Sequence, residues 1–241
     1  MTEISVREQV QPTMSDEDLA LVSEEFESAP VRSIIAWAVD LFGDSLALAA
    51  SFEDIVLIDL ATSVAPGIEV VFLDTEAHFP ETLSFVESVR ARYDLNLTVT
   101  RPGPEAAAHP CGTDQCCQFR KVEPLRRKLR ELEAWITSIR REQTTARARA
   151  HKLEWDDKFS LVKINPIADW TAKQVWRYIH DHDVPYNPLH DRSFPSIGCT
   201  HCTRAVGPGE DARAGRWPGF AKTECGLHAI EPAPASSEVE L

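Results

Sequence analysis

Short apolar runs alternate along the chain with longer segments whose apolar residues recur at helical spacing. The apolar runs have the length of buried strands and are bounded by turn residues. They cover residues 45–50, 69–73, 95–100, 134–139 and 161–164. The helical segments cover residues 15–26, 30–42, 54–64, 80–93, 118–131 and 171–181. Because strands that alternate with helices are joined by right-handed crossovers, this order predicts an α/β fold with a parallel, doubly wound sheet.

Residues at the helix ends support these boundaries. Ser15 is placed to cap a helix with an acidic first turn, and Asp18 stands at its third position. Gly43 follows the second helix, where glycine commonly ends one, and Pro80 lies in the first turn of the fourth. Capping and periodicity therefore agree on where the helices begin and end.

Composition divides the chain into three parts. Residues 1–29 form an N-terminal extension with one short helix, preceded by a polar, unpatterned stretch that we expect to be disordered. Residues 30–229 form the main domain and end in a tail, 205–229. Between 185 and 219 the chain is rich in Pro, Gly, Arg and Cys, so an irregular segment is expected there. The low-complexity residues 230–241 are expected to be a disordered tail.

The composition is that of a water-soluble globular protein, with 43% apolar and 26% charged residues. No run of about 18 apolar residues predicts a membrane span, and the first residues lack a secretory pattern, so we expect a cytoplasmic protein with reduced thiols. There are 25 basic and 38 acidic residues, which gives a net charge of −13. Such a surface disfavours binding to nucleic acid.

Arginine is nevertheless concentrated in two places, which is compatible with a small anionic substrate or with a solvated basic face. The two groups are Arg140, Arg141, Arg147 and Arg149, and Arg204, Arg213 and Arg216.

Four cysteines form two close pairs that could share one metal site. Cys116 and Cys117 are adjacent, and Cys199 and Cys202 form a Cys-x-x-Cys pair about eighty residues downstream. Four thiolates can hold a zinc ion or an iron–sulfur cluster. Adjacent cysteines bind a single tetrahedral ion only with a sharp backbone bend, whereas a cube offers separate corners, so the spacing favours iron–sulfur over zinc. Cys111 is interpreted as a non-ligand because the other four complete the set.

A further cysteine, Cys225, lies in a charged segment between Lys222 and His228. Nearby positive charge favours the thiolate, which is the reactive form, so Cys225 is a candidate nucleophile with Lys222 and His228 as possible thiolate support. Lys121 follows Cys117 by one helical turn and either offsets thiolate charge beside an anionic substrate or is a solvated lysine.

The loops after the first two predicted strands are candidate ligand sites, because open α/β sheets bind ligands at the carboxyl ends of their strands. The first loop contains Ser51 and runs directly into a helix, although Glu53 and Asp54 would repel a phosphate and could instead cap that helix. The second strand ends in Leu73 and Asp74, where an aspartate orients a loop or meets a ribose hydroxyl.

At this point four motifs resemble a known family. Residues 114–125 (DQCCQFRKVEPL), 195–203 (PSIGCTHCT), 213–217 (RAGRW) and 222–228 (KTECGLH) are similar to those of the assimilatory sulfonucleotide reductases. The likeness runs from about residue 31 to 229. The two cysteine pairs resemble those of the iron–sulfur branch, the adenylyl-sulfate (APS) reductases, whereas the branch that reduces 3′-phosphoadenylyl sulfate (PAPS) lacks the cluster cysteines.

The resemblance implies an adenine nucleotide α-hydrolase-like fold, related to the ATP pyrophosphatases. It implies thioredoxin-dependent reduction of APS to sulfite and AMP through an enzyme S-sulfocysteine. The donor would be reduced thioredoxin or a glutaredoxin-like protein, and a homo-oligomer is compatible with the family.

The resemblance also implies roles for individual residues. A [4Fe-4S] cluster is expected on Cys116, Cys117, Cys199 and Cys202, with Lys121 between cluster and substrate. Cys225 is the implied nucleophile. The residues expected to contact the substrate are Arg213 and Arg216 at its sulfate or phosphate, Arg140 and Arg141 at the nucleotide, and Ser51, Leu73 and Asp74 at the adenosine.

Three features depart from the family pattern. The loop 51–54 is shorter than usual, Ser138 stands where the family commonly has glycine, and Cys111 is extra. Two alternatives stay open: reduction of PAPS, alone or together with APS, and a cluster-containing ATP-dependent tRNA thiolase on a related fold. The charge of −13 argues against the second.

Overall fold

A computed structural model describes residues 14–228 and shows a six-stranded sheet in the order β3-β2-β1-β4-β6-β5. Its strands are β1 (Leu46–Ala50), β2 (Glu69–Leu73), β3 (Asn96–Thr100), β4 (Ala134–Ile136), β5 (Leu153–Asp156) and β6 (Leu161–Ile164). All neighbouring strands are parallel except β5, which runs antiparallel to β6 at the edge. The predicted α/β class with a parallel, doubly wound sheet is confirmed. The predicted disordered stretches at the two ends lie outside the described residues, apart from Met14.

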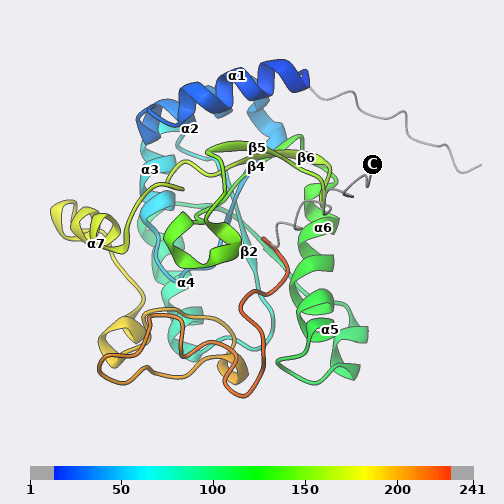
Figure 1. Cartoon of the computed structure of the whole chain (residues 1–241), viewed down its shortest axis with the longest axis vertical. Coiled ribbons are helices and arrows are strands. Elements are labelled where there is room, and N and C mark those ends of the chain that lie inside the picture. Colours follow the sequence, from blue (N-terminus) through cyan, green and yellow to red (C-terminus); the bar gives the residue numbers. More distant parts are fainter. Residues whose placement is uncertain (1–13, 229–241) are drawn as a thin grey trace, which may run out of the picture.

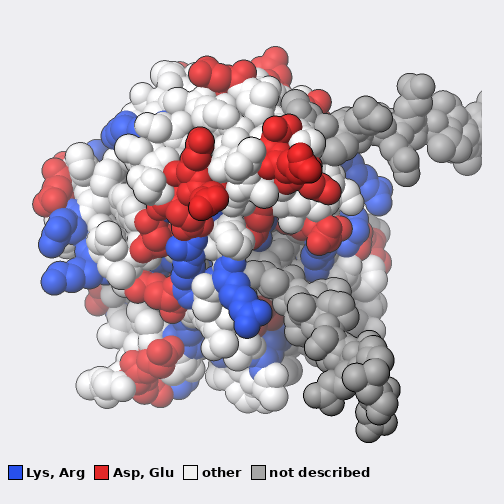
Figure 2. Space-filling view, turned by 45° about the horizontal axis from the view of Figure 1, so that its top comes forward, with Lys and Arg blue, Asp and Glu red and all other residues white. Residues whose placement is uncertain are grey.

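Helices flank this sheet, with α3 and α4 on the left and α6 on the right in the view of Figure 1. The helices are α1 (Asp16–Phe26), α2 (Val31–Phe42), α3 (Val56–Val64), α4 (Pro80–Tyr93), α5 (Asp114–Cys117), α6 (Glu123–Leu129) and α7 (Ala172–Asp181). Within residues 14–228 no helix is long and apolar enough to cross a membrane. Acidic side chains are prominent on the face shown in Figure 2, with Lys and Arg set among them.

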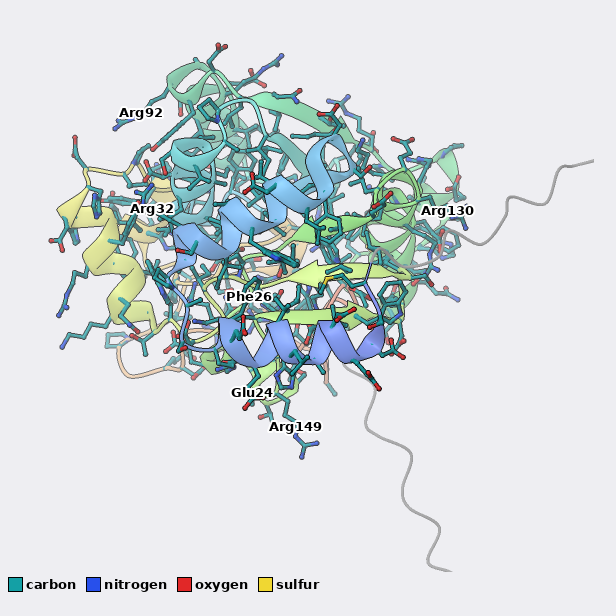
Figure 3. All side chains as sticks on the ribbon, turned by 90° about the horizontal axis from the view of Figure 1, so that it is seen from above. Glu24, Phe26, Arg32, Arg92, Arg130 and Arg149 are labelled. Carbon is teal, nitrogen blue, oxygen red and sulfur yellow. The ribbon has the colours of Figure 1, made fainter. Side chains whose placement is uncertain are left out.

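The core lies on both faces of the central strands, as expected for parallel strands covered by helices. Ile34 and Ile35 of α2, Ile136 of β4 and Ile164 of β6 are fully buried. Helix α1 also belongs to this core, because Phe26 is buried and packs edge-on against Trp37 at 5.0 Å. Seen from above, α1 and α2 lie on either side of Phe26 (Figure 3).

Three elements differ from the sequence prediction. The strand predicted over 134–139 ends at Ile136, although the Thr137 amide still donates to the Ile164 carbonyl of β6 at 2.8 Å. The helix predicted over 118–131 begins at Asp114, passes through a π-helical turn at Gln118–Val122 and ends at Leu129. Strand β5 was not predicted because its polar sequence, Leu-Glu-Trp-Asp, lacks an apolar run. It is an edge strand whose Leu153 carbonyl accepts a hydrogen bond from Ser23 of α1 at 2.6 Å.

The chain order places a ligand site at the centre of the sheet. From β1 the chain winds outward through β2 to β3 and then returns to β4 on the other side of β1. This reversal is the topological switch point, where loops leave the carboxyl ends of neighbouring strands in opposite directions and open a crevice. The loops that follow β1, β2 and β4 therefore surround one cleft.

The irregular segment expected between 185 and 219 is tied to the loop after β1. Asn187, which is fully buried, donates hydrogen bonds to the Phe52 carbonyl at 3.1 Å and to Thr82 Oγ1 at 3.0 Å. The Glu53 carboxylate accepts a hydrogen bond from the Ile197 amide at 2.8 Å. Glu53, whose charge would repel a phosphate, thus holds the segment that carries Cys199 in place.

Candidate active site

A cleft opens at the carboxyl ends of β1, β2 and β4, and side chains from distant parts of the chain line it. Of the residues predicted from the sequence, the structure brings seven to this cleft: Ser51, Leu73, Lys121, Arg213, Arg216, Cys225 and His228. The tail returns to the strand ends here, shown in red near the middle of Figure 1. Ser138, which stands where the resemblance expects glycine, also lines the cleft.

Four other predicted residues lie elsewhere. Arg140 lines the adjoining cavity, and its guanidinium is 3.6 Å from the Asp54 carboxylate. Arg141 points away and forms two hydrogen bonds with Glu27, at 2.6 and 2.7 Å. The remaining two, Asp74 and Lys222, pair with Arg101 at 3.1 Å and with Asp114 at 2.7 Å, respectively. Arg141, Asp74 and Lys222 therefore do not line the cleft, although Lys222 lies over Trp217, which does, 5.8 Å from its ring centroid.

Several cleft residues were not predicted. Arg147 was noted only as part of an arginine group, and Gln143, His78 and Trp135 had no sequence signal. His78 contacts the Leu73 carbonyl through Nε2 at 2.9 Å, and burial lowers its pKa, so its ring is neutral near pH 7. Trp135 reaches the cleft from β4 and the other three from the segments that follow β2 and β4. Local sequence patterns do not reveal that these side chains meet.

Lys121 reaches the cleft from the π-helical turn that follows α5. Such turns insert an extra residue into a helix and are frequent at functional sites, because they redirect the side chains around them. Burial lowers the pKa of Lys121. The charges of Cys199, Cys225 and Cys117 raise it by more than burial lowers it, so the net shift is upward. Lys121 is therefore an ammonium ion at neutral pH, close enough to Cys225 and to the paired cysteines for their charges to act on it.

Cys225 is partly buried and packs against the cluster formed by Cys199, Cys202 and Trp217. Burial raises the pKa of its thiol, whereas Lys121, a hydrogen bond from the Leu227 amide, Arg216 and Arg147 lower it. The balance is downward. A thiol with a lowered pKa in an electropositive cleft has the environment of a reactive cysteine.

The cations of the cleft are crowded. Burial lowers the pKa of Arg213, and the neighbouring Arg147 and Arg216 lower it further. Arg216 lies over the ring of Trp217, 4.6 Å from its centroid, and donates to the Ile197 carbonyl at 3.2 Å. Positive charges held this close together favour an anion between them.

The four paired cysteines are buried, with 5–7% of each residue exposed, and all are free thiols. Cys116 and Cys117 lie in α5, whose N-terminus is capped by Thr113. Cys199 precedes a short 3₁₀ turn, and Cys202 is the last residue of that turn. Burial, together with the charges of Cys199, Cys117 and Cys116, raises the pKa of Cys202 to about 11. The two cysteine pairs are therefore close enough for the charge on one pair to shift the pKa of the other.

Four buried thiols in one region can ionise together only beside a strong positive charge, which a bound metal ion or an iron–sulfur cluster would supply. Within residues 14–228 no three Cys, His, Asp or Glu side chains gather as ligands of a single metal ion. Cys111 lies near Cys116, since its charge contributes to raising the pKa of that thiol. Cys111 is partly exposed, whereas the four paired cysteines are buried.

The residues on either side of Cys225 are also held in place. Arg213 Nη2 donates to the Thr223 carbonyl at 3.1 Å, and Lys158 donates to the Gly226 carbonyl. Leu227 packs against the cluster that contains Trp135, and the His228 ring stacks on Trp135 at 5.8 Å with an interplanar angle of 11°.

Burial and the nearby Arg147, Lys163, Lys158 and Arg213 lower the pKa of His228 well below its usual value, so it is a neutral ring at pH 7.

Comparison with known proteins gives a consistent result. The model of the phosphoadenosine phosphosulfate reductase domain matches residues 45–205. A phosphoadenosine 5′-phosphosulfate reductase from Gloeobacter violaceus is 46% identical over 92% of this chain and 98% of its own. Adenosine 5′-phosphosulfate reductases from Shouchella clausii and Streptomyces coelicolor are each 42% identical, over 90% and 91% of this chain and 95% and 98% of theirs.

Solved structures agree on the fold. A phosphoadenylyl-sulfate reductase from Candida auris, in a phosphate complex, has a TM-score of 0.69 at 28% identity and covers 79% of this chain and 98% of its own. An FMN adenylyltransferase from Candida glabrata has a TM-score of 0.56 at 15% identity, over 81% of this chain and 69% of its own. The second likeness shows the fold alone.

Replacing Lys121 by Met should raise the pKa of Cys225, because the largest of the charges that lower it is removed. The thiolate fraction at pH 7 then falls, and alkylation of Cys225 by iodoacetamide slows. The measurement is the pH profile of alkylation, followed by mass spectrometry of the tail peptide. Lys173→Met, an exposed lysine on α7, is the matched control and should leave the profile unchanged. Identical profiles for Lys121→Met and the wild type would contradict this account of the cleft.

Proposed function

The chain belongs to the phosphoadenosine phosphosulfate reductase family, and from that premise we propose that it reduces adenylyl sulfate to sulfite and AMP. The observation that carries the proposal is the position of Cys225, whose thiol has a lowered pKa in a cleft lined by Lys121, Arg213 and Arg216. Curated relatives that match most of the chain are adenosine 5′-phosphosulfate reductases. Reduced thiols and this chemistry fit a cytoplasmic enzyme.

In the proposed first step the Cys225 thiolate attacks the sulfur atom of the sulfate group. The bond between that sulfur and the bridging oxygen breaks, AMP leaves with the bonding electrons, and Cys225 becomes an S-sulfocysteine. Ser51 and Leu73 line the same cleft and are proposed to hold the adenosine.

In the second step a thiolate of reduced thioredoxin, or of a glutaredoxin-like protein, attacks Cys225 Sγ and releases sulfite. The partner's second thiol then resolves the mixed disulfide. The two electrons come from the dithiol, which ends as a disulfide, and Cys225 returns as a thiolate.

The cations of the cleft address the main electrostatic difficulty of the first step. A thiolate and a sulfate ester are both negative, so their approach in a partly desolvated site is unfavourable without compensating charge. Arg213 and Arg216 are proposed to contact the sulfate or phosphate, and Lys121 stands beside Cys225. Loss of one preorganised group of this kind typically slows catalysis by about 10²–10³-fold.

The four buried cysteines are proposed to hold a [4Fe-4S] cluster. Their burial, their mutual charge effects and the neighbouring ammonium of Lys121 support this. When bound, the cluster would supply fixed charge beside the substrate and join α5 to the turn at Cys199, without taking part in electron transfer. A zinc ion on the same thiols is the rival assignment, and a homo-oligomer stays a prediction.

The Cys225→Ser variant tests the nucleophile. It should form no S-sulfonate on incubation with APS and no sulfite on addition of dithiol, because a serine hydroxyl is not ionised near pH 7. Intact mass after APS treatment shows the added sulfonate directly. Cys111→Ser is the control and should still form the intermediate. S-sulfonate appearing in Cys225→Ser would refute the assignment.

Protein purified without oxygen should be brown, with broad visible absorbance and about four irons per chain. Cys202→Ser should lose most of the colour and iron, whereas Cys111→Ser should keep both. Iron analysis and the absorbance spectrum provide the measurement. A colourless, zinc-loaded protein that still turns over substrate would overturn the cluster assignment.

PAPS is the second candidate substrate, because the relative from Gloeobacter violaceus is a phosphoadenosine 5′-phosphosulfate reductase. The two substrates differ by one phosphate, for which one or two extra cations suffice. Turnover of APS and PAPS at equal, limiting concentrations compares their kcat/KM values. We expect the higher value for APS, and a higher value for PAPS would reverse the assignment.

A further inference from the structure

The carboxylate of Glu224, the residue before Cys225, is held by several hydrogen bonds. The proposed reaction of the Cys225 thiol does not itself require them. The Glu224 side chain is only 9% exposed, although it lies in an irregular tail. Its Oε1 accepts hydrogen bonds from Arg147 Nε at 2.8 Å and from Thr144 Oγ1 at 2.7 Å, and its Oε2 accepts one from Arg147 Nη2 at 2.7 Å. Two parallel bonds from one guanidinium form the bidentate arrangement, which is directional as well as strong.

The partner side is equally constrained. The Arg147 side chain is 10% exposed, and its Nη1 donates to Gln143 Oε1 at 2.6 Å. The same oxygen accepts the Arg140 amide at 2.9 Å, which fixes Gln143 on the turn after β4. Gln143 therefore helps to orient the Arg147 guanidinium toward Glu224.

Glu224 is ionised in this position. Burial raises the pKa of its carboxyl, but the contacts with Arg147 and Thr144 and the charge of Arg213 hold the pKa below its usual range. A buried, hydrogen-bonded ion pair of this kind is costly to break by removing one partner, because the other charge is left buried and alone.

The two proposed half-reactions make opposite demands on the tail. Cys225 must be inside the cleft to attack the nucleotide, and its sulfur must be accessible to a second protein when sulfite is released. We infer that the Glu224–Arg147 pair is a latch that holds Cys225 in the cleft for the first half-reaction and opens for the second. Glu224 is thus a positioning residue. This inference rests on the proposed function.

The latch gives a signature that separates the half-reactions. The tail opens and closes in every turnover, so its docked and open states are in equilibrium. Losing the ion pair lowers the fraction of molecules in which Cys225 is docked in the cleft. Formation of S-sulfocysteine should slow by about 30-fold in Glu224→Gln, the lower end for truncating a buried charge pair. Release of sulfite from already formed S-sulfocysteine by dithiol should not slow, since that step uses the open tail.

The experiment compares Glu224→Gln and Thr144→Val with the wild type. Single-turnover formation of S-sulfocysteine is followed by intact mass, and its discharge is followed separately with dithiothreitol and with reduced thioredoxin. Thr144→Val removes one hydrogen bond to the carboxylate without altering the tail sequence, and formation should slow by about tenfold. Amide hydrogen exchange of residues 221–228 should accelerate in both variants, while that of β1 stays unchanged.

Glu210→Gln is the matched control. Glu210 also pairs with an arginine, Arg204, at 2.8 Å, but both side chains are exposed. It should change neither half-reaction nor the exchange of the tail.

Slower formation with undiminished discharge and faster tail exchange supports the latch. Formation and exchange equal to those of the wild type, or a parallel slowing of both half-reactions, overturns it. If the wild type itself forms no S-sulfocysteine, the proposed function fails, and tail exchange in Thr144→Val still decides whether the latch exists.

Discussion

The interaction on which this site depends is the attraction between a few partly buried cations and the anionic groups they surround. The chain carries a net charge of −13, yet Lys121, Arg147, Arg213 and Arg216 line one cleft. Lys121 and Arg216 favour the thiolate of Cys225, and Arg147 holds the carboxylate beside it. In a partly desolvated cleft such charges act more strongly than on the surface, so a small number outweighs the acidity of the whole molecule.

The fold concentrates these cations by bringing distant segments to one point. The switch point between β1 and β4 creates the crevice, the π-helical turn supplies Lys121, and the irregular C-terminal segment supplies Arg213 and Arg216. Carboxylates hold the pieces together. Glu53 anchors the backbone at Ile197, and Glu224 anchors the tail. Acidic residues near an anion site are thus compatible with its function when each is committed to a partner in the protein.

The same arrangement joins the paired cysteines to the chemistry of the cleft. The charges of Cys117 and Cys199, and also that of Cys225, raise the pKa of Lys121. Whatever occupies the four thiols therefore influences the electrostatics of Cys225 through one ammonium group. An electrostatic link of this kind would give the proposed cluster an effect on the proposed reaction without electron transfer.

The sequence by itself determined the fold class, most helix and strand boundaries and the presence of two close cysteine pairs, because hydrophobic periodicity and short motifs are local properties. It could not reveal β5, whose polar residues become a strand only when β6 and α1 cover them. It also could not separate Arg140 and Arg141 from Arg147. Only the tertiary structure decided this. Arg140 pairs with Asp54 in the adjoining cavity and Arg141 with Glu27, whereas Arg147 lines the cleft and binds Glu224, which lies 77 positions later in the chain. The direction of a long charged side chain is set by partners that are remote in sequence, and a linear pattern contains no record of them.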